Sequence, residues 1–230
     1  MFRLTRTFLV SLWMLSAALG AQEKPAVWLR LDEGTGNVIS NAAGSSRGEL
    51  KGAKWSQGKS GKALEVNGTN AYASAAIPEL PGSFTFSAWT KPLSMSNENP
   101  GGEACIVART GYHNALGYNL RGRFYFGIWQ ADNKNPAALS PVESPVGAWH
   151  HVVGVYDKDG AKIHLYVNGE LKATAPMTAA PRTYPPQLFI GTGSTGGKYS
   201  FGYRGIVDEV KVFDRALGAQ EIKAAYDAQK

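Results

Sequence analysis

The stretch from Tyr112 to Trp129 combines flat aromatic rings with polar side chains at close spacing. A sugar presents weakly apolar C–H faces and a ring of hydroxyls, so its binding site needs an aromatic platform and polar groups that fix its orientation. The candidate carbohydrate-binding residues in this stretch are Tyr112, Asn119, Arg121, Tyr125 and Trp129. The alternative is that these rings pack into a core or cover a sheet, which is the commoner use of aromatic side chains.

The residues just before Trp129 alternate as in a half-buried strand. Phe124, Phe126 and Ile128 fall on one side and predict a core face, because successive strand residues point to opposite sides. Tyr125 and Trp129 share the other side with a small glycine between them, which leaves room for a ligand. We therefore expect these two rings to project from the concave face of a sheet.

The sequence contains one pair of carboxylates and one pair of histidines that could support catalysis, and neither has a pattern typical of an active site. A retaining glycosidase needs two carboxylates about 5–5.5 Å apart, a spacing that positions i and i+2 of a strand provide. Asp157 and Asp159 have this spacing, but Gly160 follows them and the group predicts a turn. His150 and His151 are adjacent, so on a strand they point to opposite faces and cannot bind one metal ion. These patterns favour binding over catalysis and give no zinc site.

Strand signals dominate the chain, and turn residues interrupt them at short intervals. The clearest hairpin joins 163–167 to 170–174 through Asn168-Gly169, a pair that tolerates the positive φ angles of a type I′ turn. A single helix is expected near the end, over 217–226. The pattern predicts an all-β fold, a two-sheet antiparallel β-sandwich with a short C-terminal helix. Its longest irregular segments, where binding sites usually lie, are 92–103, 131–147, 176–186 and 193–203.

Residues 1–21 have the order of a secretory signal peptide, with a basic start, an apolar run over 8–15 and small residues before a cleavage point after Gly20 or Ala21. The apolar run is shorter than the ~20 residues that cross a bilayer. We therefore expect no membrane span after cleavage, and a secreted protein, periplasmic or extracellular. The remaining residues, 22–230, are expected to form one domain.

Charge is scattered along the chain. The formal charge of +6 falls to +4 when Arg3 and Arg6 leave with the signal peptide. No run of about five or six like charges occurs, so a nucleic-acid-binding surface is not expected, although weak attraction of an anionic polysaccharide is. The one cysteine, Cys105, lies in an apolar strand-like run and is expected to be a buried, unreactive thiol.

Five motifs occur along the chain in a defined order. They are WLRLDEGTG (28–36), GKALEVNG (61–68), FTFSAWTKP (84–92), WHHVV with LYVNG (149–169), and GIVDEV with RAL (205–217). This order resembles the laminin G-like (LamG-like) jelly rolls of the concanavalin A-like lectin/glucanase superfamily. The resemblance implies two stacked, curved antiparallel sheets of roughly six or seven strands each, with the first and last strands side by side.

The resemblance also bears on catalysis and metal binding. The Glu-x-Asp-x-x-Glu run of related glucanases is absent, as are the Gln-x-His and Tyr-x-Lys-x-Gly-x-Tyr patterns of alginate-lyase-like relatives. In related jelly rolls a structural calcium joins the first strand, a nearby loop and an Asp of the last strand. Asp208 matches that last-strand Asp, and Asp32 and Asn67 would supply the other oxygen ligands of Ca²⁺. The alternative is that Asp32 and Asp208 only make turn and edge hydrogen bonds.

The sequence therefore predicts a non-catalytic binding module that recognises carbohydrate, as a polysaccharide or glycoprotein, with calcium as a structural ion. The fold alone does not decide this function, because it hosts lectins, hydrolases, lyases and adhesion modules. A protein-binding adhesion or assembly module is the first alternative, and a glycan-degrading hydrolase or lyase is the second. The oligomeric state is left open.

Overall fold

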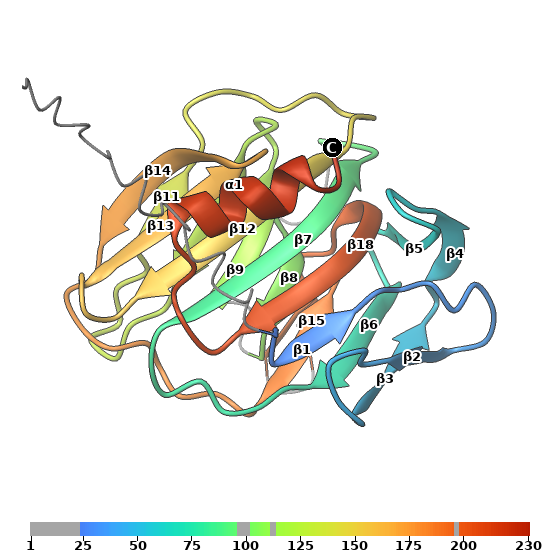
Figure 1. The fold of residues 1–230 in the computed structure, drawn as a ribbon, viewed down its shortest axis with the longest axis horizontal. Coiled ribbons are helices and arrows are strands. Elements are labelled where there is room, and N and C mark those ends of the chain that lie inside the picture. The colour runs from blue at the N-terminus through green and yellow to red at the C-terminus, as the bar shows by residue number, and fades with distance from the viewer. Residues whose placement is uncertain (1–23, 96–101, 111–113, 196–197) are drawn as a thin grey trace, which may run out of the picture.

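The computed structural model describes residues 24–95, 102–110, 114–195 and 198–230. In this part of the chain two antiparallel sheets stack face to face, and one helix lies on the outside (Figure 1). The predicted two-sheet antiparallel β-sandwich with a short C-terminal helix is confirmed. Each large sheet has eight strands, slightly more than the resemblance implied.

The first sheet, named here the β7 sheet, runs in the order β14-β13-β12-β7-β18-β5-β4, with β1 pairing on β18. Its strands are β1 (Val27–Leu29), β4 (Lys54–Gln57), β5 (Lys62–Asn67), β7 (Phe84–Pro92), β12 (His150–Asp157), β13 (Lys162–Val167), β14 (Glu170–Pro176) and β18 (Arg204–Phe213). The clearest predicted hairpin is confirmed, since Asn168 and Gly169 join β13 to β14 with φ angles of 55° and 79°. Positive φ at both positions is what a type I′ turn requires.

The second sheet, the β8 sheet, runs in the order β11-β10-β9-β8-β15-β6-β3-β2. Its strands are β2 (Val38–Ser40), β3 (Arg47–Lys51), β6 (Tyr72–Ala76), β8 (Glu103–Arg109), β9 (Asn114–Asn119), β10 (Phe124–Ile128), β11 (Ala137–Leu139) and β15 (Gln187–Ile190). A separate hairpin, β16 (Gly193–Thr195) and β17 (Lys198–Ser200), places Tyr199 on Tyr72 of β6 with ring centroids 4.4 Å apart.

The hydrophobic core fills the space between the two sheets. Phe84 and Phe86 of β7 meet Phe126 of β10 edge to face, with centroids 6.4 and 6.3 Å apart. Phe124, Phe126 and Ile128 are fully buried, so the predicted core face of this strand is confirmed. Burying each such side chain contributes about 1.5–3 kcal/mol.

The first and last strands lie side by side, as the resemblance implied. β1 pairs with β18 in the register Val27↔Val212 and Leu29↔Val210. A bulge interrupts β18 here, and Glu209 adopts a left-handed φ of 51°. Its Oε2 accepts the indole N–H of Trp28 at 2.8 Å, which fastens the start of the domain to its end.

Helix α1 (Ala219–Asp227) closes the described chain and lies across β12 and β7 on the outside of the β7 sheet (Figure 1). The backbone N–H of Gly218 donates to Oε2 of Glu221 at 2.9 Å, which satisfies one free donor at the start of the helix. Ile222 is fully buried against Val153 and other apolar residues of the sheet. The predicted terminal helix is therefore held by a small core of its own.

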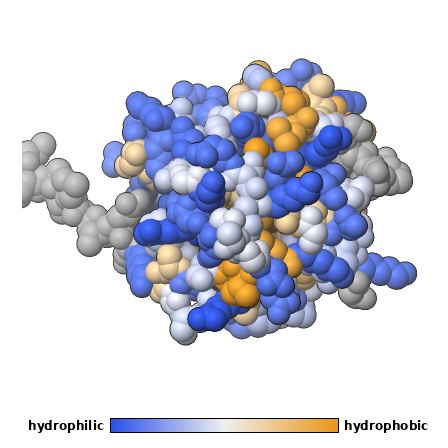
Figure 2. Space-filling model, turned by 90° about the vertical axis from the view of Figure 1, so that its right-hand side faces the viewer, coloured by the Kyte–Doolittle hydropathy of each residue, from blue (hydrophilic) through white to orange (hydrophobic). Residues whose placement is uncertain are grey.

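The surface is mostly polar on the side that Figure 2 presents, with apolar residues in separate patches. This is the right-hand side of Figure 1, where β4 and β5 lie. Within the described ranges, no helix is long and apolar enough to cross a membrane.

Candidate functional site

A cleft of about 330 Å³ opens at one end of the sandwich, between loops that connect the two sheets. Its walls are residues 79–82, between β6 and β7, and residues 180–183, between β14 and β15. Arg109 at the end of β8, Tyr156 in β12 and Lys158 just beyond β12 complete the lining. We name this the end cleft. Its volume lies at the lower end of the range for small-molecule sites, roughly 300–1,000 Å³.

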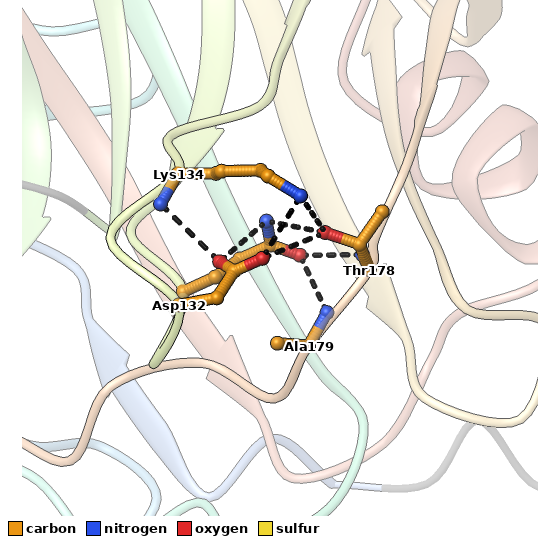
Figure 3. A network of polar contacts seen from close by, with 5 residues as sticks. Asp132, Lys134, Thr178 and Ala179 are labelled. Atoms are coloured by element: carbon orange, nitrogen blue, oxygen red, sulfur yellow. Dashed lines mark hydrogen bonds and ion pairs between the residues drawn. The ribbon is translucent and has the colours of Figure 1, made fainter.

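Gln130, which follows β10, holds the loop between β14 and β15 in place. Figure 3 shows the polar network around it, with Asp132, Lys134, Thr178 and Ala179 labelled. The Gln130 side chain is buried, and its Oε1 accepts the backbone N–H groups of Thr178 (2.6 Å) and Ala179 (2.9 Å). The hydroxyl of Thr178 donates to Oδ2 of Asp132 at 3.0 Å, and Lys134 pairs with the same oxygen at 3.2 Å. These contacts fix one wall of the end cleft relative to β10.

Arg182 lies over the ring of Trp129 at the rim of the end cleft. Its guanidinium carbon is 5.1 Å from the ring centroid, and its backbone N–H donates to the Trp129 carbonyl at 2.9 Å. A guanidinium N–H of Arg182 also donates to Oδ1 of Asn133. A cation over an indole contributes about 0.5–1 kcal/mol at exposed sites. Trp129, which is partly exposed, thus lies next to the cleft through its contact with the lining residue Arg182.

Arg109 forms the buried floor and connects the two wall loops. It is 4% exposed, and one guanidinium nitrogen donates to Oε2 of Glu79 (2.8 Å) and to the Tyr184 carbonyl (2.9 Å). Its Nε has no hydrogen-bond partner among the residues that the structure describes. Glu79 is 61% exposed, so this ion pair is only part-buried, and Arg109 connects the two wall loops through Glu79 and the Tyr184 carbonyl.

Lys158 adds a second cation from the turn after β12. Its backbone N–H donates to the hydroxyl of Ser83 at 3.0 Å, which ties the turn to the loop between β6 and β7. Asp157 Oδ1 accepts the N–H of Gly160 at 3.0 Å, so the turn predicted for these residues is confirmed. The lining of the end cleft thus includes the cations Arg109, Lys158 and Arg182.

The structure does not bring the predicted carbohydrate-binding residues together. Asn119 and Arg121 lie at the turn between β9 and β10, at the opposite end of β10 from Trp129. Oδ1 of Asn119 accepts the N–H groups of Arg121 (3.0 Å) and Arg123 (3.1 Å), which explains Asn119 as a turn residue. Tyr112 falls outside the described residues. Of the predicted set, Trp129 alone, within the described part, borders the end cleft.

Tyr125 points away from the core as expected, but it does not project from an open face. The side chain is 8% exposed and lies across Gly117 of β9, where an added Cβ would be 2.2 Å from a ring carbon. Its hydroxyl is 3.4 Å from the Ala104 carbonyl of β8. The expectation that Tyr125 offers a platform to a ligand is therefore wrong, because the space above Gly117 lets the ring cover the sheet instead.

Asp208, one of the predicted calcium ligands, is fully buried in β18. Its carboxylate accepts the backbone N–H groups of Lys59 (2.9 Å), Ser60 (3.0 Å) and Glu209 (2.8 Å). Burial raises the pKa of this carboxyl to about 7, against the opposing effect of these N–H donors. Asp208 thus serves as an acceptor for a loop of the backbone.

The other two predicted calcium ligands do not complete a site around Asp208. Asp32 accepts the N–H of Lys62 at 2.9 Å, in the loop that Asp208 also holds. Asn67 lies at the far end of β5 and its Oδ1 accepts N–H groups of its own turn, including that of Thr69 at 3.0 Å. The described ranges contain no group of three or more His, Cys, Asp or Glu suited to a metal. Asn67 thus lies apart from Asp32 and Asp208, and calcium binding stays a prediction.

Ser87 and His151 form a pair beneath α1 that the sequence did not indicate. Ser87 Oγ and His151 Nε2 are 2.9 Å apart, beside a cavity of about 30 Å³. Burial lowers the pKa of His151 to about 3, and a cavity of this size corresponds to about one water molecule. His150 packs on Phe124 on the opposite, core side, so the predicted divergence of the two histidines is confirmed. The pair therefore serves packing and leaves no room for a substrate.

Sequence reasoning missed the charged residues of the end cleft, Arg109, Lys158 and Arg182. They come from separate loops and strand ends, so no local motif contains them. The sequence did indicate one part of the cleft, because the irregular segment 176–186 was expected to contribute to a binding site and contains Arg182.

The family model described as the concanavalin A-like lectin/glucanases superfamily (Laminin_G_3) matches residues 67–223, more than half of the chain. The chain therefore belongs to this superfamily, and the resemblance of its motifs is confirmed. A relative is the pentraxin-related protein PTX3 of Mus musculus, 28% identical over 100 residues, which cover 40% of this chain and 26% of that protein.

Among solved structures, the chain is similar to several toxin binding domains. These include the binding domain of Paraclostridial Mosquitocidal Protein 1 (TM-score 0.73, 14% identity), the botulinum neurotoxin type G receptor binding domain (0.69, 13%) and the binding domain of botulinum neurotoxin DC in complex with SialylT (0.69, 10%). The matches cover 90%, 90% and 91% of this chain and 52% of each of those chains. At such identities the likeness shows the fold, and the chain spans about half the length of those domains.

Proposed function

We propose that this protein is a non-catalytic module that binds carbohydrate in the end cleft. The observation that carries the proposal is the cleft itself, in which several N–H donors converge beside the partly exposed Trp129. Aromatic faces pack against the C–H surfaces of sugars, and charged N–H groups donate to their hydroxyls. The resemblance to toxin binding domains supports a binding role, and the predicted signal peptide supports a protein that works outside the cytoplasm.

The geometry of the cleft favours this proposal over the alternatives. A glycosidase needs two carboxylates placed for the reaction, whereas Glu79, the carboxylate of the described cleft lining, is paired with Arg109. A stable protein–protein interface buries about 1,600 Å² in total. The end cleft is a small recess and is much smaller than such an interface. A small saccharide unit matches its size.

A glycan array tests the proposal, with wild type, Trp129→Ala and Trp149→Ala compared. We expect the wild type to bind at least one glycan, and Trp129→Ala to weaken that binding about tenfold with no loss of fold, because a stacking surface at the rim is removed. Trp149 is the matched control, since it is also partly exposed beneath a cation, Lys91, and lies before β12 at the other end of the sandwich.

Three results would contradict the proposal. Binding to no glycan, together with co-purification of a matrix or cell-surface protein, would favour an adhesion module. Release of reducing ends or unsaturated sugars from a polysaccharide would show an enzyme. An equal loss of binding in Trp149→Ala would place the site elsewhere.

A further inference from the structure

The end cleft contains two cations that pair with no described carboxylate. Arg109 is paired with Glu79 at 2.8 Å. Lys158 and Arg182, by contrast, form no ion pair with any residue that the structure describes. Because no described carboxylate pairs with either charge, both can interact with an anionic group in the cleft.

The two unpaired cations enter the cleft from different walls and are positioned differently. Arg182 belongs to the loop between β14 and β15, and its guanidinium is held by Asn133 and the ring of Trp129. A planar guanidinium fixed in this way presents a fork of donors that matches an oxyanion. Lys158 comes from the turn after β12 and is exposed, so its side chain can adjust to the ligand.

Three of the nearby carboxylates have other partners, whereas Asp159 follows Lys158 in the turn beside the cleft. Glu79 is neutralised by Arg109, and Asp132 is paired with Lys134 at 3.2 Å. Asp157 caps its own turn through the N–H of Gly160. The lining itself contains three cations, Arg109, Lys158 and Arg182, and one carboxylate, Glu79, so it favours a negatively charged ligand.

We propose that the end cleft selects saccharides that carry a carboxylate or a sulfate. Arg182 and Lys158 contact the anionic group, and Trp129 contacts a face of the sugar ring. This inference rests on the proposed carbohydrate-binding function and adds the charge of the ligand. The buried Arg109 supports the floor and keeps a free Nε donor among the described residues.

Calorimetric titration with matched ligands tests the selection. Oligogalacturonate is compared with its methyl ester, and dextran sulfate with dextran of the same length, at low salt and at about 0.15 M salt. We expect at least one charged ligand to bind about tenfold or more tightly than its uncharged counterpart, and the preference to decrease as salt rises. The two pairs show whether the carboxylate or the sulfate is the preferred group.

Variants assign the preference to the cleft. The double variant Lys158→Ala with Arg182→Gln should lose most of the preference, and Arg182→Lys should keep part of it because the charge remains. Arg121→Ala is the matched control, since this exposed arginine lies at the other end of β10 and should leave the preference unchanged. Thermal unfolding of each variant verifies that the domain is folded.

The inference is overturned if charged and uncharged ligands bind equally, or if the preference survives in the double variant. Binding of an uncharged glycan that depends on Trp129 would leave the proposed function standing while overturning the charge selection. Binding of no glycan, charged or uncharged, would overturn both.

Discussion

The carboxylates of Asp208 and Asp32 serve the protein's own backbone. Asp208 accepts backbone N–H groups of Lys59 and Ser60, and Asp32 accepts that of Lys62, so both hold one loop before β5. Gly61 in this loop has a φ of 62°, and an added Cβ would lie 2.2 Å from Asp32 Oδ1. The loop motif that the family shares is thus explained by backbone hydrogen bonds and close approach.

His151 gives a prediction for the dependence of stability on pH. Burial lowers its pKa from 6.5 to about 3, and the neighbouring charge of Lys211 acts in the same direction. Between these values the unfolded chain holds more protons than the folded chain, so this contribution to stability is complete above about pH 6.5 and is lost as pH falls towards 3. We expect the free energy of unfolding of wild type relative to His151→Leu to increase with pH across this window, as measured by urea unfolding.

The half-exposed His164 on β13 serves as the control for that experiment. Desolvation also lowers its pKa, but less burial should give a weaker dependence when it is replaced by leucine. A wild-type stability that differs from that of His151→Leu by the same amount at every pH would contradict the assignment.

In the β8 sheet, a glycine on one strand leaves space for an aromatic ring on the next, and this space determines the position of Tyr125. Tyr125 of β10 stands opposite Gly117 of β9 in register. Because β9 carries no side chain there, the ring lies flat over the strand. Gly127, two positions further along β10, has a different environment, in which an added Cβ would meet nothing closer than 3.5 Å.

Replacing each of these two glycines by alanine should change the stability of the domain by different amounts. Gly117→Ala should destabilise the domain by about 1–3 kcal/mol, because the Tyr125 ring must leave its position. Gly127→Ala should change stability little and is the matched control on the neighbouring strand. Thermal or urea unfolding measures both, and equal effects of the two substitutions would contradict the packing of Tyr125.

At the scale of the whole molecule, the sandwich separates two groups of loops. The end cleft is built from loops that cross between the sheets, while the turn that contains Asn119 and Arg121 lies at the opposite end of β10. The predicted residues were spread along one strand and its flanks, whereas the cleft gathers residues from separate segments. A rigid sandwich that presents loops at its ends is a common way to place a binding site.

The fold was largely predictable because its signals are local. Alternation assigned Phe124, Phe126 and Ile128 to the core, and Asn168-Gly169 defined a hairpin. Cys105 is buried as expected, and burial raises the pKa of its thiol to about 12. Each of these features depends on neighbours in the chain.

The site was less predictable because it depends on contacts between distant segments. The position of Tyr125 depends on which residue faces it across the sheet, and that register is not written in either strand alone. Arg109, Lys158 and Arg182 meet only when three loops and strand ends converge. The position of Trp129 just after a strand follows from the alternation of β10, and its role in binding stays a prediction.

Hydrogen–deuterium exchange with and without the tightest-binding glycan tests most directly whether ligand binds in the end cleft. We predict slower exchange in the two walls, residues 79–83 and 177–184, and in the turn after β12 that contains Lys158. Exchange at the turn between β9 and β10 should stay unchanged. Slower exchange confined to residues 119–123, or to α1, with no change in either wall, would contradict the account.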